Sequence, residues 1–280
     1  MIKIQIYKEF FKSANQFYID VDFSLKKGSF NALFGDSGSG KTTILNVIAG
    51  IKYADRGKIS VLDNVWLDTA AHINLAINKR KIGVVFQNSI LFPHLTVHEN
   101  LVFSKEKNDS LELMNELIQL FSISDLLKQF PENLSGGEKQ KVAIVRSLIR
   151  NPDLLLLDEP FSAVDFQQRK ELQDALLQVH QKLKFTALVI SHDIEEVVRL
   201  SDNIFMLDKG KVIKNGPALA LFENKEEDTT ISLTGIVVSV EQLGRNQKIR
   251  ILVGNEIHAI EKDNSMHQIG DRIIVEMKKK

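Results

Sequence analysis

The 280-residue sequence contains no cysteine. Disulfide bonds, thiol catalysis and metal or cluster sites with cysteine ligands are therefore excluded, although the absence does not fix the redox compartment. An excess of either charge is also missing, because 36 lysines and arginines balance 36 aspartates and glutamates. The chain as a whole has no positive field to attract nucleic acid, which is therefore not an expected partner, although a local basic patch would not show in the total.

Long apolar runs are missing too, although 44% of the residues are hydrophobic, as in an ordinary globular protein. The longest stretch without Asp, Glu, Lys or Arg covers residues 82–98, and polar residues and a proline interrupt it. No segment is therefore expected to cross a bilayer, and any membrane role would depend on a partner. The first ten residues alternate apolar and polar side chains, which indicates a strand and not the apolar core of a signal peptide.

The apolar pattern predicts an α/β domain with a largely parallel sheet. Period-2 alternation at residues 2–6 and 17–25 predicts two strands, which we expect to be antiparallel. Apolar runs predict strands at 29–34, 154–157 and 186–190, the last two buried on both faces of the sheet. Helical spacing predicts helices at 41–49, 110–129 and 137–150. Strands that alternate with helices over residues 29–208 are typical of this fold class.

The pattern changes after residue 224. A charged stretch near 224–229 indicates a linker, and short strands are expected at 231–240, 248–253, 256–260 and 272–277. Turn-like glycines separate these strands: Gly235, Gly244, Gly254 and Gly270. We therefore predict two domains, an α/β domain over residues 1–223 and a small all-β domain over residues 229–280.

The sequence GDSGSGKT at residues 35–42 fits the pattern G-x-x-x-x-G-K-[ST] and lies between a predicted strand and a predicted helix. Glycines let backbone N–H groups wrap around phosphate oxygens, and the helix presents its positive end to the same anion. Lys41 is expected to reach the β- and γ-phosphates, and the Thr42 hydroxyl is expected to bind Mg²⁺. The expected nucleotide-binding residues here are Gly35, Asp36, Ser37, Gly38, Ser39, Gly40, Lys41, Thr42 and Thr43.

A second motif, LLLLDEP, covers residues 154–160 and contains two neighbouring acidic residues. A buried strand delivers its two carboxylates to the sheet edge where ligands of α/β proteins bind. Asp158 is expected to join the Mg²⁺ shell, and Glu159 is the natural general base for an attacking water. Taken alone, the motif could also be a leucine-rich core strand that ends in a solvated turn.

A third motif, LSGGE at residues 134–138, opens a helix with exposed N–H groups, which is again suited to an anion.

These motifs together resemble those of the ATP-binding-cassette (ABC) ATPases. Walker A lies at 35–42, a Q-loop glutamine at Gln87, the signature LSGGEKQ at 134–140, Walker B at 154–159, a D-loop at 162–165 and a switch histidine at His192. The resemblance covers about residues 1–222. One departure is Val164 in the D-loop, where the family more often has leucine. A GTPase or kinase is disfavoured by LSGGE and by the lack of an N-K-x-D motif.

The resemblance implies that two copies sandwich two ATP molecules. Walker A of one chain and the signature of the other, Ser135, Gly136 and Gly137, would hold the same γ-phosphate, and Asp165 would communicate across the dimer. Gln87 would contact Mg²⁺ or the attacking water, and His192 would hydrogen-bond the γ-phosphate. The implied catalytic set is Glu159, His192, Gln87 and Lys41, and the implied metal set is Thr42, Gln87 and Asp158.

The family also stacks an aromatic side chain from the N-terminal strands on adenine. Phe17 is our candidate, and Phe10, Phe11 and Tyr18 are rivals, although each ring could equally belong to the core.

Because the sequence contains no membrane span, it resembles an importer subunit that docks on separate permease subunits at the cytoplasmic face of the membrane. Residues 87–97 resemble the importer segment where a groove accepts a permease helix, with Phe92 and Leu95 as groove residues, although ordinary packing is the alternative. A solute-binding protein would take part indirectly. A soluble ABC ATPase that acts on ribosomes or DNA would need paired cassettes or a coiled-coil insertion, which 280 residues do not contain.

Among importers, the sequence is most similar to the molybdate/tungstate and sulfate importer ATPases, a group that borders iron(III) and polyamine systems. Residues 229–280 resemble one copy of a small β module called TOBE or Mop, which binds oxyanions or adds to the dimer contact. Gly244, Arg245 and Asn246 offer donors to an anion or form a hairpin turn, and we favour the turn. The implied function is an ATP-hydrolysing motor subunit of an importer, driven by MgATP and moving an oxyanion such as molybdate or tungstate.

Overall fold

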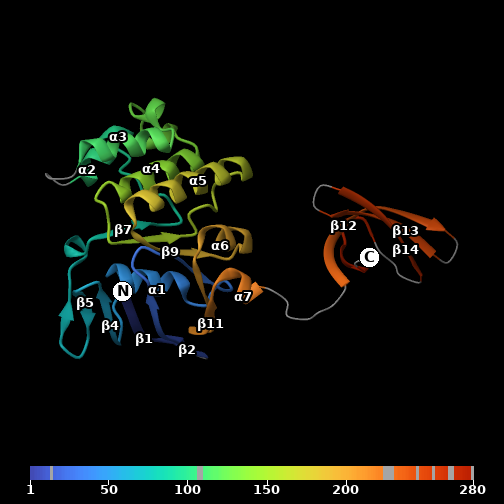
Figure 1. Ribbon diagram of the computed structural model, residues 1–280, viewed down its shortest axis with the longest axis horizontal. Coiled ribbons are helices and arrows are strands. Elements are labelled where there is room, and N and C mark those ends of the chain that lie inside the picture. Colours follow the sequence, from blue (N-terminus) through green and yellow to red (C-terminus); the bar gives the residue numbers. More distant parts are fainter. Residues whose placement is uncertain are drawn as a thin grey trace. The chain divides into compact units, whose positions relative to one another are not determined.

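The computed structural model describes residues 1–12, 15–105, 110–222, 230–243, 246–253, 256–263 and 268–278 (Figure 1). The chain divides into two compact units, Met1–Glu223 and Asn224–Lys280. The expected linker near 224–229 and two glycines expected in turns, Gly244 and Gly254, lie outside the described residues, as does Arg245. Within the described part of the chain, no helix is both long enough and apolar enough to span a membrane.

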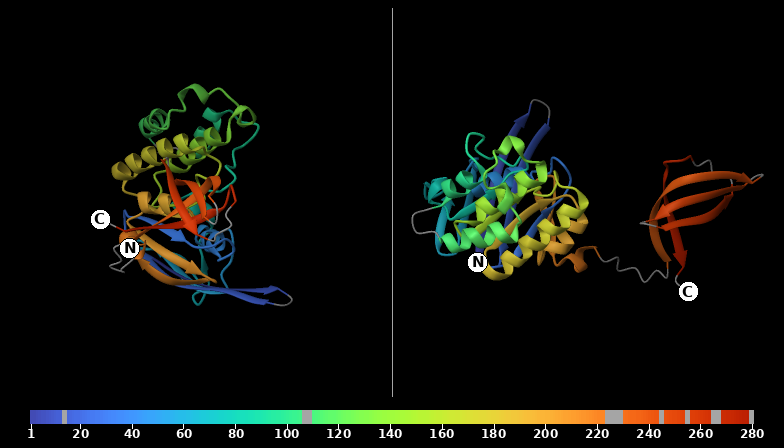
Figure 2. Two further views of the ribbon diagram at one scale, coloured as in Figure 1. Left: turned by 90° about the vertical axis from the view of Figure 1, so that its right-hand side faces the viewer. Right: turned by 90° about the horizontal axis from the view of Figure 1, so that it is seen from above.

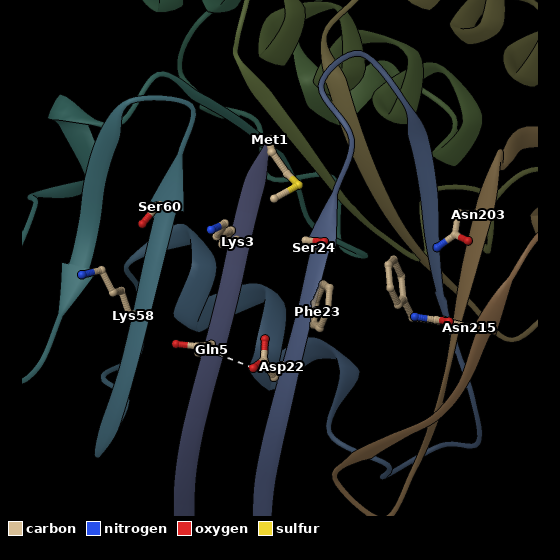
Figure 3. Close-up of a pocket in the computed structure, with 11 residues that line it drawn as sticks. Met1, Lys3, Gln5, Asp22, Phe23, Ser24, Lys58, Ser60, Asn203 and Asn215 are labelled. Atoms are coloured by element: carbon tan, nitrogen blue, oxygen red, sulfur yellow. Dashed lines mark hydrogen bonds between the residues drawn. The ribbon is translucent and has the colours of Figure 1, made fainter.

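The first unit begins with an antiparallel sheet, as the alternating pattern predicts. Its order is β2-β1-β4-β5-β6, and the strands are β1 (Ile2–Lys12), β2 (Asn15–Leu25), β4 (Arg56–Val61), β5 (Asn64–Asp68) and β6 (Ile73–Asn74). Alternate residues of β1 point to opposite faces, so that Ile4 is buried while Lys3 and Gln5 are exposed. Figure 3 shows the opposite, polar face, where the Gln5 side-chain amide donates to the Asp22 carboxylate at 2.9 Å in a pocket.

A second, six-stranded sheet forms the centre of the unit. Its order is β11-β10-β3-β9-β8-β7, and the strands are β3 (Phe30–Phe34), β7 (Ile82–Val85), β8 (Leu154–Asp158), β9 (Thr186–Ser191), β10 (Asn203–Asp208) and β11 (Lys211–Gly216). All pairs are parallel except β10 with β11. The carboxyl ends of β3, β7, β8 and β9 therefore lie at one edge, where loops can build a ligand site.

Helices complete the layers around this sheet (Figure 1 and Figure 2). They are α1 (Lys41–Ala49), α2 (Val97–Ser104), α3 (Leu111–Leu120), α4 (Gly136–Leu148), α5 (Phe166–Leu183), α6 (Ile194–Leu200) and α7 (Ala218–Phe222), with three short 3₁₀ turns at Ile77–Lys79, Ser124–Leu126 and Pro131–Asn133. Leu155 and Leu157 pack into one core with α4 and α5, whereas Leu154 and Leu156 pack into a second core with α1 and the antiparallel sheet. A strand covered on both faces explains the continuous leucine run.

The helix predicted for residues 110–129 is shorter than the leucine spacing suggests. It ends at Leu120, because Ser122 adopts a left-handed backbone with φ 53° and the Ile123 amide donates to the Ile118 carbonyl at 3.1 Å. This is the hydrogen-bonding pattern that closes a helix C-terminus. The side chains beyond it, Ile123 and Leu126, are buried and continue the apolar pattern without continuing the helix.

The second unit is a four-stranded antiparallel sheet of order β14-β13-β12-β15. Its strands are β12 (Thr230–Leu243), β13 (Asn246–Val253), β14 (Glu256–Asp263) and β15 (Arg272–Lys278). The prediction that Gly235 marks a turn is wrong, because Gly235 pairs with Ile273 inside β12. A Cβ atom there would lie 3.0 Å from a methyl group of Val253, so the position needs a small residue for close packing.

Candidate nucleotide-binding site

The loop between β3 and α1 has the geometry of an anion site. The first turn of α1 has no acidic side chain, and no side chain caps its amides, so these N–H groups point to the loop side with positive polarity. Gly40, the residue before the helix, has φ 108°, which favours glycine. A Cβ atom on Gly35 would lie 2.2 Å from the Leu207 carbonyl oxygen, so the start of the loop can only follow this path with glycine.

Lys41 lies inside the loop with only 6% of its surface exposed. Its ammonium group donates to the carbonyl oxygens of Gly35 and Asp36 at 2.7 and 2.8 Å. Burial lowers the pKa of Lys41, while the nearby carboxylates of Glu159 and Asp158 act in the opposite direction. Neutral carbonyl groups thus hold the ammonium within the loop. A bound anion can take the place of these carbonyls as its hydrogen-bond partner at little structural cost.

Thr42 and Asp158 come together from α1 and the end of β8. The Thr42 hydroxyl donates to the Asp158 carboxylate at 3.2 Å, and Asp158 is 5% exposed. Burial raises the pKa of Asp158, and the Thr42 hydrogen bond counteracts that rise. One hydroxyl and one carboxylate are hard oxygen donors, which fits Mg²⁺, an ion that keeps several of its own waters.

Three polar side chains meet next to this pair. Gln87, Glu159 and His192 follow β7, β8 and β9, three neighbouring strands. The Gln87 side-chain amide donates to one oxygen of Glu159 at 3.2 Å, and His192 Nδ1 lies 3.3 Å from the other. The sequence separates these residues by 72 and 33 positions, and the strand order alone brings them to one point.

The backbone of Glu159 is itself unusual, with φ 44° in the left-handed region. Its amide donates to the Ile190 carbonyl at 3.0 Å, and its own carbonyl accepts from the Ser162 hydroxyl at 3.0 Å. A non-glycine residue in this conformation costs about 1 kcal/mol or more. The surrounding hydrogen bonds offset that cost and aim the carboxylate at Gln87 and His192.

Aromatic residues from the N-terminal hairpin lie beside the phosphate loop. Phe10 and Phe17 line a hollow together with loop residues, Gln87 and Glu159, and their ring centroids are 5.8 Å apart. Tyr18 packs with Tyr7 at a centroid distance of 6.2 Å and does not line this hollow. The side chain of the fourth candidate, Phe11, lies outside the described residues. The hollow has these lining residues: Phe10, Phe17, Ser37, Gly38, Gly40, Lys41, Thr42, Thr43, Gln87 and Glu159.

The signature residues lie at the start of α4 and not in that hollow. Ser135 caps the helix, and its side chain and that of Glu138 each accept from the other's amide. A Cβ atom on Gly137 would lie 2.4 Å from the side-chain oxygen of Gln168, so this glycine permits close contact with α5. Asp165 caps α5 by accepting from the Gln168 amide at 3.0 Å. Within the described residues of one copy, therefore, Ser135, Gly136, Gly137 and Asp165 are apart from Lys41.

Residues 87–97 are anchored to the helices by polar side chains. Buried Asn100 of α2 bonds both the amide and the carbonyl of Phe92, at 2.9 and 3.1 Å. Arg146 of α4 lies 5.4 Å from the Phe92 ring centroid and donates to the Ile90 carbonyl. Phe92 is 36% exposed and packs edge-on against exposed Phe103 at 4.7 Å. Leu95 is half-buried. This segment thus presents apolar side chains on a firmly held backbone.

Arg80 is a buried side chain that sequence reasoning missed. Arg80 is 1% exposed, and its guanidinium donates to the Ile48 carbonyl at 2.6 Å and to the Val47 carbonyl at 3.4 Å, at the C-terminal end of α1. A cation at this end complements the helix dipole. Arg80 therefore supports the helix whose other end forms the phosphate loop. Because Arg80 lies between two lysines, the sequence indicates an exposed basic segment and not a buried side chain.

Comparison with known proteins places this geometry in a family. A family model described as ABC transporter matches residues 18–162, more than half of the chain. The chain belongs to the ABC transporter family. A solved ATP-binding cassette, described as a dimer in a post-hydrolysis state bound to ADP and Pi, has a TM-score of 0.67 and 28% identity and covers 78% of this chain and 99% of its own. The predicted cassette fold is thus confirmed.

Curated relatives in the ABC transporter family agree with the resemblance drawn from the motifs. The molybdenum import ATP-binding protein ModC of Vibrio parahaemolyticus serotype O3:K6 is 43% identical over 77% of this chain and 57% of its own length. A probable sulfate/thiosulfate import ATP-binding protein, CysA of Chlorella vulgaris, is 39% identical over 77% of this chain and 91% of its own length. This chain thus spans little more than half the length of the ModC relative.

Proposed function

We propose that this chain is the ATP-hydrolysing motor subunit of an ABC importer, in which MgATP closes a homodimer and drives uptake of an oxyanion such as molybdate or tungstate. The observation that carries the proposal is the meeting of Gln87, Glu159 and His192 beside Lys41 and the Thr42–Asp158 pair. The names of the ModC relatives support the substrate class. The CysA relative supports sulfate as a second candidate.

Each residue has a role in hydrolysis under this proposal. Lys41 exchanges its two carbonyl partners for the β- and γ-phosphates, and Glu159 accepts a proton from the water that attacks the γ-phosphorus. As the new P–O bond forms, the bond to the leaving ADP oxygen breaks. His192 donates to a γ-phosphate oxygen, and Gln87 orients the water. Thr42, Asp158 and Gln87 would hold Mg²⁺, which would supply positive charge to the phosphate oxygens.

A second copy completes the site in this proposal. Ser135, Gly136 and Gly137 of the partner subunit supply the N–H groups of a helix start to the γ-phosphate, and Asp165 contacts the partner across the interface. The position of these residues outside the Lys41 hollow supports a role in trans. The solved ATP-binding cassette with 28% identity is described as a dimer, which supports the same arrangement.

The membrane partners follow from the importer proposal. Permease subunits dock near residues 87–97, where Phe92 and Leu95 contact a permease helix, and a solute-binding protein acts indirectly. The chain then sits as a peripheral subunit at the cytoplasmic face of the membrane.

We propose that residues 1–223 form the ATPase domain and residues 229–280 a TOBE/Mop-like domain, which binds an oxyanion or adds to the dimer contact. Iron(III) import is an alternative that the elemental analysis below distinguishes by a loss of iron. Polyamine import and a soluble ABC ATPase are further alternatives, and both predict unchanged elements in that experiment.

Replacing Phe17 with alanine is expected to weaken ATP binding about tenfold. An aromatic stack contributes about 0.5–1.5 kcal/mol beyond its buried area, and Phe17 lines the hollow beside Gly40. Calorimetric titration of the purified chain with ATP measures the change, and Phe10→Ala serves as the matched variant. If Phe10→Ala weakens binding more than Phe17→Ala, the adenine contact belongs to Phe10.

Cells that lack this gene should lose molybdenum or tungsten selectively when grown on limiting molybdate, tungstate, sulfate or iron. Elemental analysis of the cells measures the loss, and complementation with the wild-type gene should restore it whereas Glu159→Gln should not. Loss of sulfur alone would favour the sulfate importer. Unchanged molybdenum, tungsten, sulfur and iron would contradict oxyanion import and move the substrate to an organic solute, or the function away from import.

A further inference from the structure

Arg169 is a charged residue of α5 for which the proposed mechanism has no role. It lies four residues after Asp165, and its side chain is 30% exposed. One guanidinium nitrogen lies 3.3 Å from an Asp193 oxygen and 3.5 Å from a Glu196 oxygen. The other donates to the Val164 carbonyl at 3.5 Å. A single cation therefore contacts both the D-loop and the start of α6.

The two segments that Arg169 joins are the ones that flank Glu159 in space. On one side, the Ser162 hydroxyl of the D-loop donates to the Glu159 carbonyl at 3.0 Å. On the other side, His192 lies 3.3 Å from the Glu159 carboxylate. Arg169 thus links the segment on one side of Glu159 to the segment on the other side. It does not line the hollow that contains Lys41.

The loop around His192 is held by a buried hydrogen-bond network that ends on Arg169. The Ser191 hydroxyl donates to Glu196 at 2.6 Å and accepts from the Asp193 amide at 3.0 Å. Asp193 in turn caps α6 by accepting from the amides of Glu195 and Glu196. His192 therefore sits between two residues, Ser191 and Asp193, whose positions depend on this network.

Charge explains why an arginine is needed here. Glu196 is 6% exposed, and burial raises the pKa of its carboxyl group while Arg169 acts against that rise. A buried carboxylate without a counter-charge is strongly destabilising. The planar fork of arginine can serve two carboxylates and a carbonyl at once, whereas the ammonium of lysine is a compact point charge on a flexible stem.

We propose that Arg169 is a positioning residue that locks the D-loop to the His192 loop, so that His192 and Glu159 keep their geometry when ATP is hydrolysed. The inference rests on the proposed ATPase function and adds a residue to it. Catalytic groups that are displaced by about 1 Å can lose about 100-fold in rate. Arg169 touches no nucleotide-contacting residue of the hollow, so nucleotide affinity should be insensitive to it.

The test is steady-state ATP hydrolysis by the purified chain with Arg169→Gln and Arg169→Lys. We expect Arg169→Gln to lower kcat about 30-fold with KM for MgATP within about twofold, and Arg169→Lys to recover only part of kcat. The matched control is Arg199→Gln, which removes a 2.7 Å ion pair with Asp174 between the same two helices and should leave kcat unchanged.

A purely structural role gives a different pattern. Adding Glu196→Gln to Arg169→Gln removes the uncompensated buried charge, so a role limited to charge balance would restore kcat, whereas lost positioning would keep it low. The inference is overturned by restored kcat in the double variant, by wild-type kcat in Arg169→Gln, or by a change in KM alone. If Arg169→Gln does not fold, the kcat of Arg169→Lys decides: a reduced value supports positioning and a wild-type value overturns it. A wild-type chain without ATPase activity would instead overturn the proposed function itself, and the inference with it.

Discussion

Glu159→Gln is expected to abolish ATP turnover while ATP binding persists. Glutamine has the shape of glutamate and can keep hydrogen bonds to Gln87 and His192, but its amide cannot accept the proton of the attacking water. Loss of a general base lowers the rate by about 10²–10⁴-fold. Because the substitution leaves the phosphate loop intact, the bound but unhydrolysed ATP should favour a closed dimer.

Phosphate release and gel filtration with ATP measure these two consequences. The matched control is Glu171→Gln, an exposed position on α5 where the same chemical change should leave turnover intact. Substitution of Glu159 with glycine would also relax its left-handed backbone at φ 44°, so glutamine is the cleaner variant. Unimpaired hydrolysis by Glu159→Gln would remove Glu159 from the catalytic role.

Lys41→Ala is expected to weaken nucleotide binding itself. The Lys41 ammonium is already buried in the loop with two carbonyl partners, so little ordering is needed before it meets a phosphate. Hydrogen bonds to charged groups contribute about 1.5–3 kcal/mol, and the loss should therefore be roughly 10- to 100-fold in Kd. This effect appears in binding, whereas that of Glu159→Gln appears in turnover.

Calorimetric titration with ATP in the presence of Mg²⁺ measures the Lys41 effect. Lys52→Ala, at an exposed position just after α1, is the control for loss of a positive charge near the same helix. A melting temperature equal to that of the wild type would show that the loop remains folded. An unchanged ATP affinity in Lys41→Ala would mean that the assignment of residues 35–42 as a phosphate loop is wrong.

The local parts of the site could be predicted from the sequence because each is a contiguous segment with its own physical signature. Residues 35–42 combine glycines, a lysine and a helix start, and the structure places α1 at the predicted residues 41–49. The leucine run 154–157 predicts a strand covered on both faces, and β8 is buried along its whole length. Alternation at residues 2–6 predicts a strand of an antiparallel sheet in the same way, and β1 pairs antiparallel with β2.

Tertiary packing decided where the α3 helix ends and whether Gly235 lies in a turn or a strand, which the apolar periodicity of the sequence could not distinguish. The spacing of leucines continued past Leu120, but a left-handed Ser122 ended the helix there. Gly235 resembled a turn residue, yet it pairs with Ile273 inside β12, and the glycine is there because Val253 leaves little room for a Cβ atom. Both errors arise because a one-dimensional pattern records which residues are apolar or small and does not record which neighbours they meet.

By itself, the sequence determined the class of fold, the phosphate loop and the two acidic residues that end a buried strand, since backbone geometry and helix polarity follow from short segments. The tertiary structure alone decided that Gln87, Glu159 and His192 meet, because this depends on β7, β8 and β9 being neighbours in the sheet. It also placed both Phe10 and Phe17 beside the loop and joined Arg169 to Glu196. These pairings link residues far apart in the chain, and only the packing of the strands and helices between them sets their distances.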